Sequence, residues 1–188
     1  MPVYYAESWI KLQLIRETHS DQSGEFELIK PKGFIDTPAV SVVMSVYNGQ
    51  KYLRESVDSI LNQTCKNFEF IIINDGSKDN SLDILFEYQA KDNRLLIVNQ
   101  NNIGLTRSLN RGVKLAASEY VARQDADDIS HPARFEKQLG FLKNHSEVAV
   151  IGCIGDVFSV NGILRTTKDQ KYSRKGIKRH LASKNLFM

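Results

Sequence analysis

The run Val40-Ser41-Val42-Val43-Met44-Ser45-Val46 decides the fold class, because it is apolar at almost every position. A strand with one solvated face alternates apolar and polar residues, whereas a strand buried on both faces is apolar nearly throughout. β-branched valines also suit an extended backbone. We therefore predict that residues 40–46 form a strand inside a sheet covered on both faces. A turn at Tyr47-Asn48-Gly49 ends it.

The segments downstream repeat this pattern of buried strand and amphipathic helix. Further strands are predicted over residues 68–73, 95–98, 119–124 and 148–154. Helices are predicted over residues 53–61, 82–86, 105–116 and 132–143. In the third helix Leu105, Leu109, Val113 and Ala116 align on one face. Regular alternation predicts an α/β domain with a mostly parallel central sheet and helices on both faces.

Both ends of the chain have a different composition. Residues 1–37 are predicted to be an N-terminal extension, with helical spacing from Trp9 to Ile15 and a polar, glycine-containing linker over residues 20–32. The α/β domain is assigned to residues 38–165. Residues 166–188 are basic and are predicted to begin an acceptor-binding part that this chain lacks. This basic segment forms either a solvated surface or a contact with an anionic membrane face or a phosphorylated acceptor.

Overall composition is that of a globular protein, with 41% hydrophobic and 25% charged residues and a net charge of +3. This mild charge does not indicate a nucleic-acid partner. No apolar run approaches the roughly 20 residues that span a bilayer, and the N-terminus lacks the pattern of a secretion signal. We expect a cytoplasmic chain, with peripheral contact at the inner membrane face as the sharper alternative. Its cysteines, Cys65 and Cys153, are expected to be buried, reduced thiols.

Three predicted strand ends carry polar, turn-forming or acidic residues: Tyr47-Asn48-Gly49, Asn74-Asp75-Gly76-Ser77 and residues 125–128. Ligands of parallel α/β sheets bind at the carboxyl ends of the strands. These three segments therefore predict one shared site. Taken alone, Asn74-Asp75-Gly76-Ser77 would be an ordinary turn.

Three carboxylates lie within four residues in Asp125-Ala126-Asp127-Asp128. Such charges repel one another unless a cation lies among them, and Mg²⁺-like ions bind one or two protein carboxylates together with substrate phosphate. An EF-hand is rejected, because Ile129 lacks a ligand oxygen and Pro132 disrupts the loop. A solvated acidic turn stays the plain alternative. The preferred hypothesis is a metal-assisted enzyme acting on a phosphate-bearing substrate.

Other nucleotide-binding and catalytic patterns are missing from the sequence. It contains no P-loop, no G-x-G-x-x-G turn after a strand and no nucleophile elbow. The four histidines lack metal-ligand spacing. A nucleotidyltransferase also uses paired acids on an α/β sheet, but the first strand here is not followed by a basic, glycine-rich phosphate loop.

The motifs together resemble the inverting family-2 glycosyltransferases of GT-A fold, over residues 39–155, and this resemblance implies a Rossmann-like nucleotide-binding half. The segments that carry this resemblance, in order, are Val42-Val43-Met44-Ser45-Val46-Tyr47-Asn48-Gly49, Leu61-Asn62-Gln63-Thr64, Ile71-Ile72-Ile73-Asn74-Asp75-Gly76-Ser77 and Asp125-Ala126-Asp127-Asp128. The resemblance implies a nucleotide-sugar donor, usually a UDP-sugar, and Mn²⁺ or Mg²⁺. It also implies a saccharide or lipid-linked acceptor, as in cell-envelope polysaccharide biosynthesis.

Site residues follow from the resemblance by position. Tyr47 and Asp75 would hold the nucleobase. Asp125 would face the ribose and diphosphate and, with Asp127 of the D-x-D, ligate the metal. Weaker candidates for donor contact are two arginines that could equally be surface cations, Arg107 and Arg134. The family commonly has Asp where this chain has Asn74.

The catalytic base is not assigned. In the family it lies well after the D-x-D, and this chain ends at Met188, so we expect the base beyond that residue. Asp156 and Asp169 lie in no recognisable motif and are not nominated. Two functions stay open: the donor-binding half of a transferase, or a nucleotide-sugar-binding module that lacks the base.

Overall fold

The computed structural model describes residues 14–159 and 162–166. The chain divides into two compact units, residues 1–139 and 140–188. A six-stranded sheet with the order β1-β2-β5-β4-β3-β6 forms the first unit. Its parallel strands are β3 (Val40–Val46), β4 (Phe68–Asp75), β5 (Leu95–Gln100) and β6 (Val121–Asp125). The predicted α/β fold with a mostly parallel sheet is confirmed.

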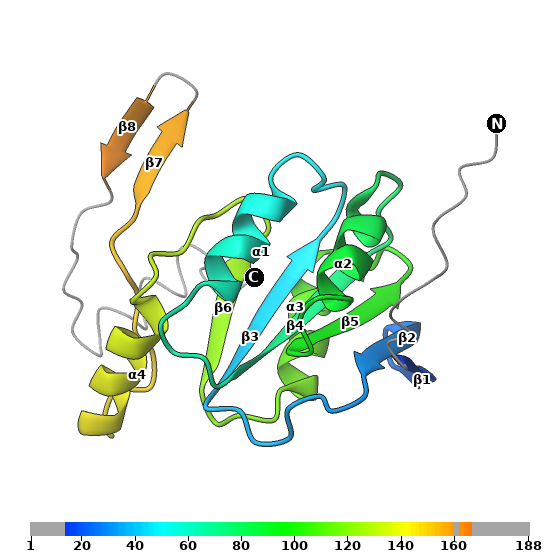
Figure 1. The fold of residues 1–188 in the computed structure, drawn as a ribbon, viewed down its shortest axis with the longest axis horizontal. Helices are drawn as coiled ribbons and strands as arrows, with labels where there is room; N and C mark the ends of the chain where they lie inside the picture. The colour runs from blue at the N-terminus through cyan, green and yellow to red at the C-terminus, as the bar shows by residue number, and fades with distance from the viewer. Residues whose placement is uncertain (1–13, 160–161, 167–188) are drawn as a thin grey trace. The chain divides into compact units, whose positions relative to one another are not determined.

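Helices cover both faces of this sheet, because successive side chains of a buried strand point to opposite sides. On one face lie α1 (Leu53–Leu61) and α2 (Ser81–Gln89), which pack on Val42, Met44 and Ile72. The other face carries α3 (Leu105–Leu115), which packs on Val43 and Ile73. Figure 1 shows α1 and α2 in front of the strands and α3 behind them.

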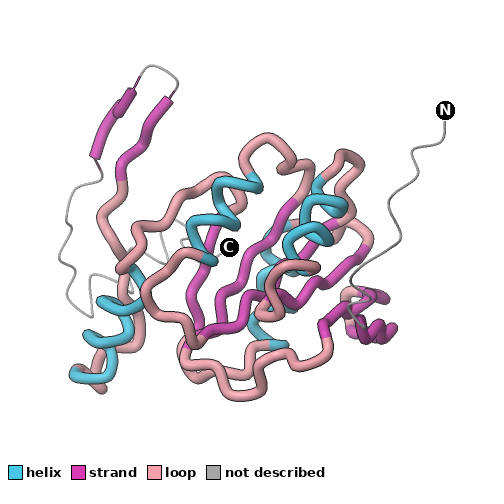
Figure 2. Tube along the Cα trace, in the orientation of Figure 1, coloured by secondary structure: helices cyan, strands magenta, loops and turns pink. Residues whose placement is uncertain are grey.

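The N-terminal prediction is wrong where the structure tests it. Residues 20–32, predicted to be a linker, belong to a hairpin of β1 (Leu14–Asp21) and β2 (Gly24–Pro31). β2 pairs antiparallel with β5 and so extends the central sheet at one edge (Figure 2). The end of the helix predicted over residues 9–15 is also wrong, because Leu14 and Ile15 are in β1. Residues 1–13 lie outside the described part of the chain.

The face predicted for α3 is confirmed in part, because Leu109 and Ala116 pack on the core at this side of the sheet. Leu105 and Val113 are exposed, whereas Ser108, Arg111 and Gly112 are buried. A Cβ atom at Gly112 would lie 2.5 Å from Val43 Cγ1 and 2.8 Å from Ile73 Cδ1, closer than real carbon atoms approach. The missing side chain therefore lets the helix lie directly on β3 and β4.

The second unit begins within α4 (Arg134–Asn144), and its other described elements are β7 (Asp156–Ser159) and β8 (Gly162–Thr166), an antiparallel pair. The strand predicted over residues 148–154 is wrong, because those residues form no regular element. Cys153 is exposed and Cys65 half-buried, so the predicted burial of both thiols is wrong for Cys153. The basic segment, apart from Thr166, lies outside the described residues. Within the described part of the chain, no helix is both long and apolar enough to cross a membrane.

Candidate functional site

A cavity of about 400 Å³ lies at the carboxyl ends of β3 and β6. It brings together Tyr47, Asp125 and Asp127, which the sequence analysis assigned to one site. The complete lining is Ser45, Tyr47, Asn48, Gly49, Tyr52, Leu105, Arg123, Asp125, Ala126 and Asp127. Aromatic rings and carboxylates therefore share one hollow, as a ligand with a flat base and a charged phosphate group requires.

The turn after β3 presents Tyr47, whose residue surface is 52% exposed. Hydrogen bonds to the turn after β4 and to the first residue of α2 hold the backbone that follows Tyr47. The N–H groups of Asn48 and Gly49 donate to the hydroxyls of Ser77 and Ser81, at 3.0 and 2.9 Å. Asn48 also accepts a 2.8 Å bond from the Lys78 N–H, with its own backbone at a φ of 52°. These bonds join the segments that follow β3 and β4. They involve residues next to Tyr47, whose own side chain lines the cavity.

The carboxylates of the acidic segment have different surroundings. Arg123 donates from Nε and Nη2 to Asp125 Oδ1, at 3.1 and 2.7 Å. Both side chains are about half exposed, so this ion pair orients Asp125 but adds little stability. Asp127 is exposed at the cavity. Partial desolvation and the nearby carboxylates of Asp125 and Asp127 raise the pKa of Asp128 above its usual value.

Below these carboxylates the acid loop, residues 125–130, is braced by the buried side chain of Gln124. Its Nε2 donates to the Asp128 carbonyl at 2.7 Å, and its Oε1 accepts from the Ser130 hydroxyl at 2.7 Å. Ser56 of α1 donates its hydroxyl to the Asp125 carbonyl at 2.9 Å. These hydrogen bonds therefore fix the loop, while its acids are turned outward.

Arg134 belongs to this brace. Its guanidinium donates to Gln124 Oε1 at 2.9 Å, to the Ser130 hydroxyl at 2.8 Å, to the Arg123 carbonyl at 2.8 Å and to Gln138 Oε1 at 3.2 Å. These donors are directed at protein acceptors, and Arg134 is not among the residues that line the cavity. The structure thus gives Arg134 a bracing role, and its predicted donor contact has no support from this geometry.

Arg107 and Asp75 also lie outside the cavity lining. Arg107 is exposed on α3 and makes no hydrogen bond or ion pair with the other described residues. Asp75, at the end of β4, is only 2% exposed. Its Oδ1 accepts from Gln100 Nε2 and from the Ile103 N–H, each at 2.8 Å, and its Oδ2 accepts from the Gly104 N–H at 3.0 Å. A carboxylate accepts about four hydrogen bonds, so about one acceptor position of Asp75 has no bond to these groups.

The donor set suits a divalent cation that is shared with a ligand. No group of three or more His, Cys, Asp or Glu residues within residues 14–159 and 162–166 is arranged to hold an ion. Mg²⁺ and similar ions, however, need only one or two protein carboxylates when phosphate oxygens and water complete the shell. Asp125 and Asp127 on the cavity wall meet that requirement.

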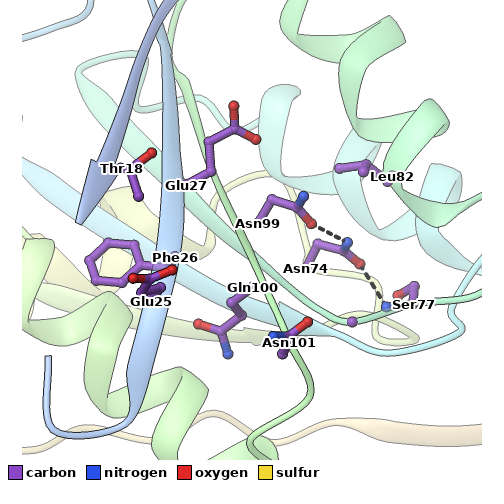
Figure 3. Close-up of a pocket in the computed structure, with 11 residues that line it drawn as sticks. Thr18, Glu25, Phe26, Glu27, Asn74, Ser77, Leu82, Asn99, Gln100 and Asn101 are labelled. Atoms are coloured by element: carbon purple, nitrogen blue, oxygen red, sulfur yellow. Dashed lines mark hydrogen bonds between the residues drawn. The ribbon is translucent and has the colours of Figure 1, made fainter. Parts of the chain in front are cut away.

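A second hollow of about 500 Å³ lies over the ends of β4 and β5 on the α2 side of the sheet, next to β2 (Figure 3). Asn74 donates to Asn99 Oδ1 at 2.8 Å and accepts from the Ser77 N–H at 3.3 Å. These two bonds stabilise the turn after β4. Figure 3 shows Gln100 pointing away from Asn99, toward the opposite face of the sheet.

Four cavity residues were not predicted as site residues from the sequence: Ser45, Tyr52, Leu105 and Arg123. Arg123 lies two residues before Asp125 on the same strand, and this spacing places both side chains on one face. That periodicity could have identified Arg123. Tyr52 directly precedes α1, where no sequence pattern distinguishes a cavity residue from a surface residue.

Comparison with known proteins places this geometry in context. Residues 41–188 match the family model described as glycosyl transferase family 2. An uncharacterized glycosyltransferase of Methanocaldococcus jannaschii is 40% identical over 158 residues, which cover 82% of this chain and 54% of that protein. An uncharacterized glycosyltransferase of Haemophilus influenzae is 42% identical over 116 residues, which cover 61% of this chain and 36% of that protein. The chain thus spans about half or less of these relatives. The structure of residues 1–349 of S. aureus TarS in complex with UDP-GlcNAc matches with a TM-score of 0.54 and 25% identity, over 65% of this chain and 41% of that TarS chain.

Proposed function

This chain belongs to glycosyltransferase family 2, and we propose that it forms the donor-binding part of an enzyme that transfers a sugar from a UDP-sugar to an acceptor hydroxyl. One observation carries the proposal: Tyr47, Asp125 and Asp127 line a single cavity at the carboxyl ends of two parallel strands. A uridine donor is supported by the likeness to TarS, which binds UDP-GlcNAc.

Each part of the donor finds a chemical counterpart at this site. The exposed ring of Tyr47 is placed to stack on a uracil. Asp75 would accept the imide N–H of the base with the acceptor position that its three protein bonds leave open. Asp125 would face the ribose and the diphosphate.

Asp125 and Asp127 would hold Mn²⁺ or Mg²⁺ together with the diphosphate. When bound, such a cation offsets the negative charge that develops on the departing UDP. The protein residues have a separate task, which is to fix both carboxylates where the diphosphate enters. Gln124, Ser56 and Arg134 supply that rigidity through the acid loop.

The transfer itself would be a single displacement with inversion at the anomeric carbon. The bond from that carbon to the diphosphate oxygen breaks as the acceptor oxygen forms a new bond from the opposite face. The acceptor proton passes to a carboxylate base. We assign no described residue to that base.

Calorimetric titration of UDP with and without Mn²⁺ tests the proposal. We expect heat of binding only when Mn²⁺ is present, and a loss of affinity of about tenfold or more in Asp127→Asn, equivalent to about 1.4 kcal/mol. Asp36→Asn is the matched control, because it removes one exposed carboxylate outside the cavity. Equal UDP affinity in both variants, or no UDP binding by the wild type, would contradict the proposal. Release of UDP from UDP-sugars in the presence of acceptors then separates a transferase from a binding module.

A further inference from the structure

A buried polar chain connects the N-terminal hairpin to Asp75. It begins at Arg111 of α3, whose surface is only 3% exposed. Arg111 donates from Nε to Asp21 Oδ2 at 2.9 Å and from Nη2 to Asp21 Oδ1 at 2.5 Å, the two-pronged geometry of a strong arginine–carboxylate pair. The Gly24 carbonyl accepts a further bond at 3.1 Å, and the guanidinium carbon lies 4.2 Å from the centre of the Phe26 ring. The hairpin therefore surrounds the guanidinium with an acid, a carbonyl and a ring.

The next member of the chain is Gln100 at the end of β5. Arg111 donates from Nη1 to Gln100 Oε1. The amide nitrogen of Gln100 then donates to Asp75 Oδ1 at 2.8 Å and to the Ser108 hydroxyl at 2.9 Å. A glutamine amide has one donor end and one acceptor end. Because Arg111 occupies the acceptor end, the donor end must face Asp75.

Asp75 connects this polar chain to the backbone at the start of α3, next to the cavity. Its two oxygens hold the Ile103 and Gly104 N–H groups, directly before α3 begins at Leu105. Gly104 adopts a φ of 87°, a conformation that glycine tolerates and that sets the entry angle of the helix. Leu105 lines the cavity together with Tyr47 and Asp125. The far end of the polar chain thus reaches the donor site.

Orientation of Gln100 is the step that a loss of Arg111 or Asp21 would disturb. Loss of Arg111 removes the donor at Oε1, and loss of Asp21 removes the carboxylate that holds the guanidinium beside Gln100. In either case the amide can rotate and turn its carbonyl toward the Asp75 carboxylate. Two acceptors facing each other repel, and Asp75 would then move away from the position set by the Ile103 and Gly104 N–H groups. The hydrogen bonds of Arg111 do more than pair a buried charge, because they form a continuous chain from Asp21 of the hairpin through Gln100 to Asp75.

We infer that Asp21 and Arg111 are positioning residues of the donor site, which act through Gln100 to fix the Asp75 carboxylate and the start of α3. The hairpin, which lies outside the residues that match the family model, thereby takes part in recognising the nucleobase. This inference rests on the proposed function, because it presumes that Asp75 contacts the base of the donor.

The first test needs no ligand. Amide hydrogen exchange, measured by NMR on the free protein, reports the bonds that Asp75 accepts from the Ile103 and Gly104 N–H groups. Asp21→Ala is expected to accelerate exchange at both amides by about fivefold or more. Glu27→Ala is the matched control, because it removes a carboxylate that pairs with Arg16 in the same hairpin, at 3.3 Å, and does not bond to Arg111 or Gln100. Asp21→Glu, which restores the charge, should return exchange toward the wild-type rate.

The second test measures base discrimination as the ratio of the dissociation constants for ADP and UDP with Mn²⁺. Asp21→Ala should reduce this ratio by about fivefold while leaving the affinity for inorganic pyrophosphate unchanged. Uniform weakening of all three ligands, or unchanged exchange at Ile103 and Gly104, would overturn the inference. If the wild type binds no UDP, the proposed function fails and the base-recognition part of the inference fails with it. The exchange result then decides only whether the hairpin positions Asp75.

Discussion

Substitution of Gln124 by methionine should destabilise the protein and loosen the acid loop. Methionine is unbranched and similar in length, so it keeps most of the packing while it removes both polar ends. Three close hydrogen bonds would be lost: one to the Asp128 carbonyl and two that Oε1 accepts, from the Ser130 hydroxyl and from Arg134 Nη1. Gln124 is buried, so water cannot replace its bonds to these groups.

The magnitude follows from these bonds. Each is worth about 1 kcal/mol on average, so the free energy of unfolding should fall by about 3 kcal/mol. Arg134 and Ser130 keep a bond to each other at 2.8 Å, which limits the loss. For a protein of this size about 3 kcal/mol corresponds to a melting temperature lower by about 6–12 °C.

Urea denaturation and thermal melting measure both quantities. Gln22→Met provides the control, because it makes the same chemical change at an exposed position in the β1–β2 turn. If Gln124→Met and Gln22→Met differ by less than about 0.5 kcal/mol, the brace contributes no stability and the reasoning is wrong. The same variant should also bind UDP more weakly with Mn²⁺, because its acid loop holds Asp125 and Asp127 less firmly.

Three further predictions address the core, the hairpin and the base site. Val57→Asp, which buries a charge without a partner on α1, should cost more than about 4 kcal/mol and yield little soluble protein; wild-type melting of this variant would contradict the architecture. Hydrogen bonding from Arg111 lowers the pKa of Asp21 from 3.8 to about 2, so its stabilising effect is present above pH 3.8 and is lost as the pH falls toward 2. Urea midpoints of wild type and Asp21→Asn should therefore differ at pH 5 and converge near pH 2; a constant difference would refute the pair. Asp75→Ala should weaken UDP binding far more than Mn²⁺ binding in calorimetry, and equal losses would remove Asp75 from the base site.

The central sheet could be predicted because its strands are buried on both faces. Residues 40–46 and 68–73 are apolar nearly throughout, and few other structures accept such segments. Two of the three predicted strand ends then located the cavity, since Tyr47, Asp125 and Asp127 line it. The third strand end lies elsewhere, because Asn74, Gly76 and Ser77 line the second hollow. The register of a parallel sheet brings such segments together regardless of the details of packing.

The hairpin could not be predicted from the same signals, because edge strands carry charge. β1 is largely exposed and contains six charged or polar residues in succession, from Arg16 to Asp21, which is a common way to protect a sheet edge from further pairing. Of the two hairpin strands, β2 is the one with buried apolar residues, namely Phe26, Leu28 and Ile29. A polar strand followed by a glycine turn has the same composition as a linker, so the error at residues 20–32 reflects a real ambiguity in composition.

Helix α3 shows why the arginines of the site were harder to assign than the acids. Apolar spacing favoured a face with Leu105, Leu109, Val113 and Ala116, and Leu109 and Ala116 do pack on the core. Leu105 and Val113 are exposed, however, and the buried face also includes Ser108, Arg111 and Gly112. Predictions from hydrophobic periodicity assume that polar residues avoid the interior. That assumption fails where the interior contains hydrogen-bond partners for a polar side chain. Close approach at Gly112 turns the helix toward β3 and β4, and Arg111 is then satisfied by groups from the hairpin and β5. The same rotation leaves Leu105 at the cavity, so the polar burial that defeats the periodicity argument also shapes the candidate donor site.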